Sequence, residues 1–368
     1  MFKARKSLLT AAGYLYLMAF GVFLPSAANA SELTWVNWFQ ITFGESIKFL
    51  SVLPSTAPNT MPAIALAADR FKPDGVIHFY RLDLLSGRVA EKSDIRMSAD
   101  FPKLAIVQAV LSRDGSRLLI ANTTHEVILY DIAAKKVLNR FSGHRQGTTF
   151  VEFSHDESKV AAIDEYRNLW IWEVAGDQET PTQVIELPQW AGRVEFFEGD
   201  TKLRVYGEET ISTYSIAAGR LETAKNISPR LQVDRMHRPE TVLFSADGTT
   251  FLAEQYVANG DEGAVGRYRR DTGEMVWSHN LGKINPPPGW PVTANNPTGY
   301  VLSSNESCLI VGDWGGYRVL DPATGVLKFR QQVNASGYYL RLSLDGKYLL
   351  DLGDSNVTVY RLPTECGV

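Results

Sequence analysis

The chain has 368 residues, with 37 Lys and Arg against 41 Asp and Glu, so its formal net charge is −4. This acidic balance argues against a nucleic-acid-binding protein, which needs a basic face. The length suits one large domain or two ordinary ones, and 29 Gly, 17 Pro and 11% aromatic residues are typical of an all-β protein rich in turns.

The first thirty residues have the features of a secretory signal peptide. A basic start precedes a largely apolar, uncharged segment at residues 8–24, and Ala28-Asn29-Ala30 supplies the small side chains of a cleavage site. We predict a signal peptide at residues 1–30, no membrane span after its removal, and a periplasmic or secreted location. An uncleaved anchor is the alternative, although about 17 apolar residues lie near the lower limit for crossing a bilayer.

A four-strand pattern repeats along the rest of the chain. Residues 148–174 show three of its strands, separated by two polar turns. The first turn has the form apolar–Ser–x–Asp/Asn–Gly/Glu, and it recurs at Leu111–Gly115, Phe153–Glu157, Phe244–Gly248, Leu302–Glu306 and Leu342–Gly346, with a degenerate copy at 196–200. Most copies lie about 40–50 residues apart, which predicts a β-propeller.

The number of copies predicts a closed ring. Six copies carry the full pattern, and a less regular seventh covers residues 46–92. The last copy ends at Leu362 after three strands, whereas residues 33–43 form a spare strand near the amino terminus. We therefore predict an all-β, seven-bladed β-propeller at residues 31–368. Its amino-terminal strand completes the final blade and removes the open sheet edges.

The repeats resemble those of the WD40 propeller family over nearly the whole chain after residue 30. Gly143-His144 followed by Trp172-Glu173 is the nearest match to the paired signature of that family, and His144 is expected to cap a blade turn. The family also places an Asp six residues before this Trp, where the chain has Tyr166. The resemblance therefore implies the fold of a divergent member.

Two further stretches, Asp271–Trp277 and Asp321–Phe329, resemble the tryptophan-docking repeat of quinoprotein propellers. In that repeat, a turn leads into a strand whose aromatic side chain packs between blades, and it does not imply a bound quinone. Seven blades also resemble the propeller chain of quinoprotein amine dehydrogenases, whose cofactor lies on a partner subunit.

Three long segments fall on one predicted face of the ring, which we call the top face. They cover residues 225–240, 257–263 and 283–297. Long insertions on one face of a propeller usually mark its binding surface. The candidates for ligand or partner binding on them are Arg230, Arg235, His237, Arg238, Asn259, Asp261 and Trp290. Solvated loops, and a Trp290 packed into a blade junction, are the alternatives.

The sequence shows no metal site and no catalytic constellation. No two His residues have the spacing of zinc ligands, and no His pairs with an evident nucleophile. Asp261, Glu262 and Asp313 could contribute to a calcium site, but a solvated loop is favoured because no oxygen-rich ligand run is present. We predict no cofactor. Cys308 and Cys366 map close together on the opposite face, so they are candidates for a disulfide, with free thiols as the alternative.

These features favour a binding scaffold over an enzyme. The leading hypothesis is a periplasmic or secreted propeller that binds an envelope protein or peptide through its top face. The alternatives are an oxidoreductase subunit resembling the amine dehydrogenase propeller chain, and a metal-dependent hydrolase or lactonase.

Overall fold

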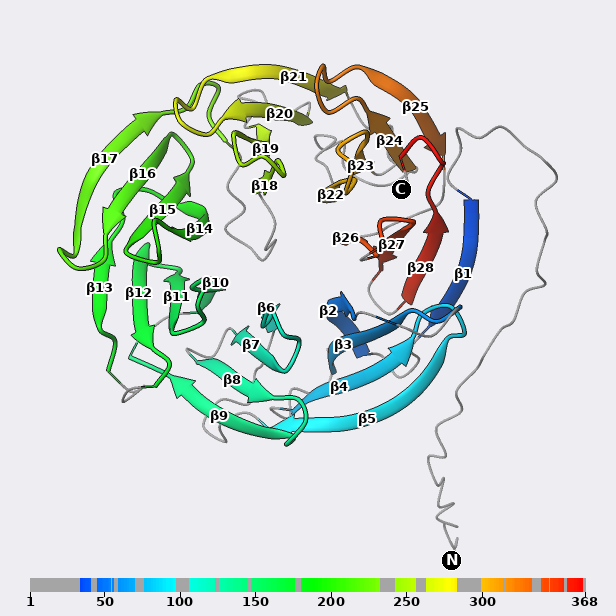
Figure 1. Ribbon diagram of the computed structural model, residues 1–368, viewed down its shortest axis with the longest axis horizontal. Helices are drawn as coiled ribbons and strands as arrows, with labels where there is room; N and C mark the ends of the chain where they lie inside the picture. Colours follow the sequence, from blue (N-terminus) through cyan, green and yellow to red (C-terminus); the bar gives the residue numbers. More distant parts are fainter. Residues whose placement is uncertain are drawn as a thin grey trace, which may run out of the picture.

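The computed structural model is an all-β, seven-bladed β-propeller, as the repeat predicts (Figure 1). It describes residues 34–40, 45–53, 55, 59–69, 76–96, 106–122, 126–143, 147–175, 180–231, 242–255, 263–282, 299–313, 316–332, 339–343, 345–353 and 356–366. Each blade is a four-stranded antiparallel sheet, and Figure 1 shows the first strands of the blades around the central axis and the fourth strands on the rim. No helix in these ranges is long and apolar enough to cross a bilayer.

The strands fall into seven blades in chain order. Blade 1 contains β2 (Glu45–Val52), β3 (Pro62–Asp69), β4 (Val76–Asp83) and β5 (Arg88–Arg96). Blade 2 contains β6 (Ile106–Leu111), β7 (Arg117–Asn122), β8 (Val127–Asp131) and β9 (Lys136–Phe141). Blade 3 contains β10 (Thr148–Phe153), β11 (Lys159–Asp164), β12 (Asn168–Glu173) and β13 (Gln183–Glu186). Blade 4 contains β14 (Ala191–Phe197), β15 (Lys202–Gly207), β16 (Thr210–Ser215) and β17 (Arg220–Asn226).

The remaining blades follow the same order until the ring closes. Blade 5 contains β18 (Val242–Phe244), β19 (Thr250–Gln255), β20 (Gly263–Arg269) and β21 (Met275–Gly282). Blade 6 contains β22 (Gly299–Leu302), β23 (Leu309–Asp313), β24 (Gly316–Leu320) and β25 (Leu327–Gln332). Blade 7 contains β26 (Tyr339–Leu342), β27 (Tyr348–Leu352), β28 (Asn356–Arg361) and β1 (Thr34–Gln40).

The ring is closed by the amino-terminal strand. β1 pairs antiparallel with β28, from Thr34 opposite Arg361 to Gln40 opposite Asn356. Figure 1 shows β1 on the outside of β28, so blade 7 joins segments from both ends of the chain. The predicted closure is therefore confirmed, and it gives the outward edge of β28 a backbone partner.

The core of the described chain lies between blades. It forms seven clusters of buried apolar side chains, and each cluster draws its residues from two neighbouring blades. Trp172 of blade 3 is fully buried against Phe141 of blade 2, with ring centroids 5.7 Å apart, and its Nε1 donates to the carbonyl oxygen of Ser142 at 3.2 Å. This confirms that Trp172 packs between blades.

The acidic partner expected six residues before a tryptophan belongs to the neighbouring Trp170, not to Trp172. The sequence comparison placed Tyr166 where an Asp was expected, six residues before Trp172. In the structure, Asp164 lies six residues before Trp170 and accepts a hydrogen bond from its Nε1 at 2.9 Å. The carboxylate of Asp164 also accepts the amides of Tyr166 and Asn168.

One hydrogen-bonded turn is repeated in five blades. Ser112 donates from Oγ to Asp114 at 2.7 Å and accepts the amide of Arg117 at 2.9 Å. Equivalent pairs of bonds are made by Ser154, Ser245, Ser303 and Ser343. The fourth residue of each turn has a positive φ, which Gly adopts without strain, as at Gly115 with φ 71°.

In three blades an acid takes this glycine-like position and bonds to the blade before it. Glu157, Asp200 and Glu306 have φ values of 57°, 61° and 52°. Their carboxylates accept the backbone amides of Arg113, His155 and Ala246, respectively, each in the turn of the preceding blade. We call these three contacts the interblade clasps. They offset the cost of a left-handed backbone conformation with hydrogen bonds that cross a blade boundary.

Trp277 packs as the tryptophan-docking resemblance implies. Its Nε1 donates to the carbonyl oxygen of Pro322 in blade 6 at 2.9 Å. Gly325 lies against the indole, because a Cβ atom added there would be only 2.6 Å from it. The turn at residues 321–325 is therefore a docking surface for the preceding blade.

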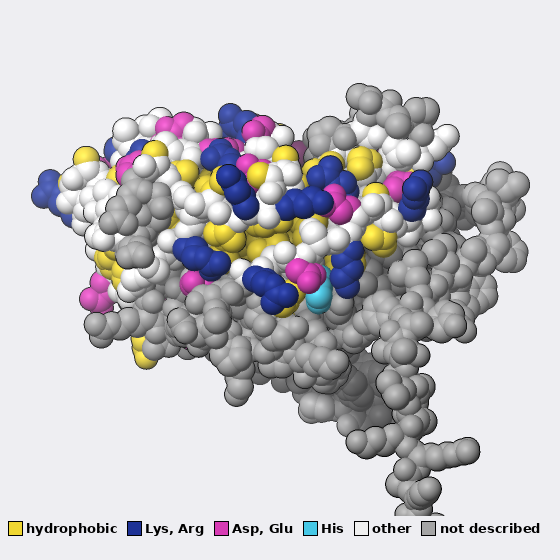
Figure 2. All heavy atoms as spheres, turned by 90° about the horizontal axis from the view of Figure 1, so that it is seen from below, with side chains coloured by type: hydrophobic (Ala, Val, Ile, Leu, Met, Phe, Trp, Pro, Cys, Tyr) yellow, Lys and Arg dark blue, Asp and Glu magenta, His cyan; other side chains and the backbone are white. Residues whose placement is uncertain are grey.

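The outer rim of the ring is polar and mixed in charge. β5 alternates exposed and half-buried residues along most of its length. Figure 2 views the molecule from the rim that lies lowest in Figure 1, and it shows Lys and Arg interspersed with acidic and apolar side chains. Charged side chains on outer strands discourage edge-to-edge association.

Candidate functional site

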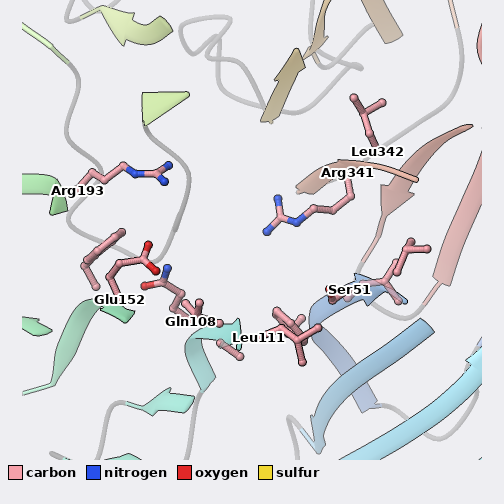
Figure 3. Close-up of a pocket in the computed structure, with 13 residues that line it drawn as sticks. Ser51, Gln108, Leu111, Glu152, Arg193, Arg341 and Leu342 are labelled. Carbon is pink, nitrogen blue, oxygen red and sulfur yellow. The ribbon is translucent and has the colours of Figure 1, made fainter. Parts of the chain in front are cut away.

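A cavity of about 300 Å³ lies in the axial channel, where first strands of several blades face one another. It is lined by residues of β2, β6, β10, β14 and β26. Its labelled polar side chains are Ser51, Gln108, Glu152, Arg193 and Arg341 (Figure 3). Figure 3 shows Gln108, Glu152 and Arg193 grouped on one side, with Arg341 reaching toward them from the opposite side.

Arg193, the third residue of β14, is held in place by blade 5. Its Nη1 donates to the carbonyl oxygen of Val242 at 2.7 Å, and its guanidinium carbon lies 4.6 Å from the ring centroid of Phe244. Its Nε is buried and has no hydrogen-bond partner among the described residues. The side chain is thus oriented by two neutral groups of blade 5.

Several other half-buried arginines form ion pairs with carboxylates, in the pairs Arg117–Glu157, Arg204–Glu195, Arg267–Glu306, Arg270–Glu195 and Arg318–Asp313. Arg193 forms no ion pair with a carboxylate in the described part of the chain. Because a desolvated charge is costly without a counter-ion, Arg193 is a favourable place for a bound anion.

Gln108 and Glu152 contribute opposite kinds of group to the cavity. The Oε1 of Gln108 accepts the amide of Val151 at 2.7 Å, so its amide nitrogen is left as a donor. Burial raises the pKa of Glu152, and the charge of Glu195 adds to this effect, whereas Arg193 opposes it. Glu152 is therefore easier to protonate than an ordinary Glu, and when ionised it places a negative charge on the same side of the cavity as Gln108 and Arg193 (Figure 3).

Arg341 brings a second guanidinium to the same space from blade 7. It lies on β26, and its Nη1 donates to the carbonyl oxygen of Leu340 at 3.0 Å. Since blades 4 and 7 lie on different sides of the ring, the two arginines approach the cavity from different directions (Figures 1 and 3). The arrangement can bind an anion between them.

A second cavity of about 340 Å³ shares Glu152 and Arg193 with the first. In it, the ring of Phe244 lies between two guanidinium groups, that of Arg193 and that of Arg270 at 4.7 Å. Arg270 is paired with Glu195, which also accepts the hydroxyl of Tyr206 at 3.2 Å. Burial raises the pKa of Tyr206 to about 12. The charge of Arg270, which lies behind Phe244, is thus compensated by Glu195.

Of the seven top-face candidates, the structure describes Arg230. Its guanidinium pairs with Glu208 and lies 3.6 Å from Glu209, with 41% of the side chain exposed. The other six, Arg235, His237, Arg238, Asn259, Asp261 and Trp290, lie outside the described residues, as does His144. Their assignment to a binding surface stays a prediction.

The candidate calcium ligand Asp313 lies within an ion-pair network. Its buried carboxylate is 2.8 Å from Nε of Arg318 and 3.5 Å from Arg330. The other two candidates, Asp261 and Glu262, are outside the described ranges. Within those ranges, no group of three or more His, Cys, Asp or Glu side chains is placed to hold a metal ion.

Cys308 and Cys366 form a disulfide in the structure, with their Cα atoms 5.2 Å apart. Cys308 directly precedes β23 of blade 6, and Cys366 follows β28 of blade 7. Both lie in the apolar cluster between these blades. The bond therefore links the last two blades covalently, next to the strand pair that closes the ring.

The axial residues were not singled out from the sequence, although the repeat contains a signal for them. Two residues before the turn serine, blades 2, 5 and 6 carry the apolar Val110, Leu243 and Val301. At the same place, blade 3 has Glu152 and blade 7 has Arg341. A charged residue where other copies of a repeat are apolar indicates a position with a different environment, here the channel.

No protein-family model matches the chain, and a search of curated proteins finds no significant match.

Proposed function

We propose that this protein is a binding propeller of the periplasm or cell exterior, which recognises a protein or peptide partner and does not transform it. The observation that carries the proposal is Arg193, a guanidinium held rigidly in an axial cavity by Val242 and Phe244 with no carboxylate partner among the described residues. A preorganised charged group in a concave site is typical of recognition. The signal-peptide features of residues 1–30 support the location.

Panning of a random-peptide display library against the immobilised propeller tests this proposal. We expect enrichment of peptides that bind the folded protein with one-to-one stoichiometry. Deletion of residues 283–297 should weaken their binding if the top face takes part in recognition. Failure to enrich any peptide above the level of a heat-denatured sample would contradict a peptide-binding role.

Two enzymatic roles are the alternatives, and both follow from resemblance or fold. One is an oxidoreductase subunit similar to the propeller chain of quinoprotein amine dehydrogenases, and the other is a metal-dependent hydrolase or lactonase. Metal analysis of the purified protein, and an absorbance scan of any complex it forms with an envelope subunit, distinguish them from the proposed role. A stoichiometric metal or a quinone absorption band would contradict the binding propeller.

A further inference from the structure

We infer that the axial cavity is a carboxylate-binding site, in which Arg193 and Arg341 hold the anion and the amide nitrogen of Gln108 donates an additional hydrogen bond. The inference rests on the proposed binding function, because the carboxylate would belong to an acidic side chain or to the terminus of a bound peptide. A free small carboxylic acid offers the same chemistry, and the experiment below separates the two sources.

The donors on the cavity wall suit an oxyanion such as a carboxylate. A guanidinium presents parallel N–H groups that match the two oxygens of a carboxylate. Arg193 has its Nη1 committed to the carbonyl oxygen of Val242, and its Nη2 makes no hydrogen bond among the described residues. Gln108 has its oxygen committed to Val151, so its nitrogen can donate to the ligand.

The site is organised before any ligand arrives. Phe244 stacks on the guanidinium of Arg193, and the amide of Val151 fixes the side chain of Gln108. Side chains that are already ordered lose little conformational entropy on binding, so more of the interaction energy contributes to affinity. A volume of about 300 Å³ is at the small end for ligand sites and suits a short acid or one peptide side chain.

Glu152 makes the site sensitive to pH. The charged and titratable groups around it are Arg193 and Glu195 from β14, His155 from the adjoining turn and, across the cavity, Arg341. An ionised Glu152 repels an incoming anion, whereas a protonated Glu152 can donate a hydrogen bond to it. Carboxylate binding should therefore strengthen as the pH falls, and at pH 8, where phosphate carries two charges on one small group, phosphate should bind less tightly than a carboxylate.

Titration calorimetry of the purified propeller at pH 6 and pH 8 in low salt tests the inference. The probes are succinate, an acetylated and amidated tetraglutamate peptide, and inorganic phosphate. The variants are Arg193→Met and Arg341→Met, which keep the apolar stem of the side chain, and Glu152→Gln. The matched control is Arg88→Met, because Arg88 is exposed on the rim strand β5.

We expect carboxylate binding that is stronger at pH 6 and that weakens by about tenfold or more in each cavity arginine variant, since a charged hydrogen bond is lost. Arg88→Met should bind like the wild type, and Glu152→Gln should bind more tightly with less dependence on pH. Circular dichroism and a melting curve establish that each variant is folded. If Arg193→Met does not fold, the loss of carboxylate affinity in Arg341→Met, on the opposite wall of the cavity, tests the site instead.

The outcomes separate the two proposals. Binding of the peptide supports both of them. Binding of succinate without the peptide supports the carboxylate site and contradicts the peptide-binding role. Three results would overturn the carboxylate site. They are wild-type affinity in both arginine variants, tighter binding of phosphate than of either carboxylate, and no binding of any probe. Peptides enriched by panning would then still support the proposed function.

Discussion

The fold lowers the pKa of some acidic residues and raises the pKa of others. In the blade turns, hydrogen bonds from Ser112 and from the Ser116 amide lower the pKa of Asp114 to about 2, and Ser245 and Thr249 do the same for Asp247. Asp351 on β27 is buried between blades 6 and 7, where burial raises its pKa to about 6. Its Oδ2 accepts the hydroxyl of Tyr317, whereas its Oδ1 is buried with no hydrogen-bond partner in the described chain.

Asp351→Asn should therefore stabilise the protein at neutral pH. An unfolded chain ionises this carboxyl near 3.8 and the folded chain near 6, so the wild type loses stability as the pH rises from about 4 to about 6. Replacing the acid with an amide of the same shape should raise the free energy of unfolding by on the order of 2–3 kcal/mol at pH 7.5. Urea denaturation at pH 7.5 and pH 4 measures the effect, with the exposed Asp271→Asn as the control. An equal gain at both pH values would contradict this reading of Asp351.

Glu157→Gly should destabilise the protein even though it relieves a left-handed backbone conformation. Glycine removes the steric cost of φ 57°, but it also removes the clasp to the amide of Arg113 at 2.6 Å and the ion pair with Arg117. We expect a net loss of about 1 kcal/mol in the free energy of unfolding. Asn59→Gly is the control, because Asn59 has a similar φ of 58° in an exposed turn. A stabilisation by both substitutions would show that the clasp contributes nothing.

At the scale of strands and turns, periodicity located most elements, because alternating apolar residues and Ser–x–Asp turns are local features. It did not assign β13, because nine residues separate β12 from β13, whereas four to six residues precede the fourth strand in blades 1, 2, 4, 5 and 6. The clasps could not be predicted either, since an acid in a turn has no sequence mark that says which neighbouring blade it contacts. The axial site is also assembled from different blades, so only the ring geometry brings Arg193 and Arg341 into one cavity.

Replacing both cysteines by Ser should lower stability through the link between blades 6 and 7. The disulfide spans a sequence separation of 58 residues, and a loop of that length corresponds to about 4 kcal/mol in the chain-entropy model. Urea denaturation of the double variant under oxidising conditions measures the loss. The wild type in reductant should match the variant, and a difference between the two would indicate an effect of Ser beyond the loss of the bond.

At the scale of the whole molecule, stability depends on a closed ring in which every blade packs against two others. The seven apolar clusters each bridge two blades, so an opening at one place exposes apolar surface on both sides of it. The sequence allowed the ring and its closure to be predicted because the last repeat lacked one strand and the amino terminus supplied one.

Deleting residues 34–40 should leave the outward edge of β28 without a partner. We expect a lower melting temperature and concentration-dependent association, because an unpaired strand edge templates pairing with other chains. A synthetic peptide of residues 34–40 should restore the melting temperature when added to the deleted protein, whereas a scrambled peptide should not. Unchanged melting and a monomeric state in the deleted protein would contradict a closing role for β1.

The pairing of β1 with β28 also determines when the protein can finish folding. During synthesis β1 emerges early, whereas its partner is completed only after the six intervening blades have been made. Contacts between such distant segments form slowly, because a long loop must close before they can contribute. The nascent chain therefore carries an unsealed ring, with two exposed blade faces, until β28 has been synthesised. A chaperone that shields those faces would act in that interval, and it would no longer be needed once β1 has paired with β28.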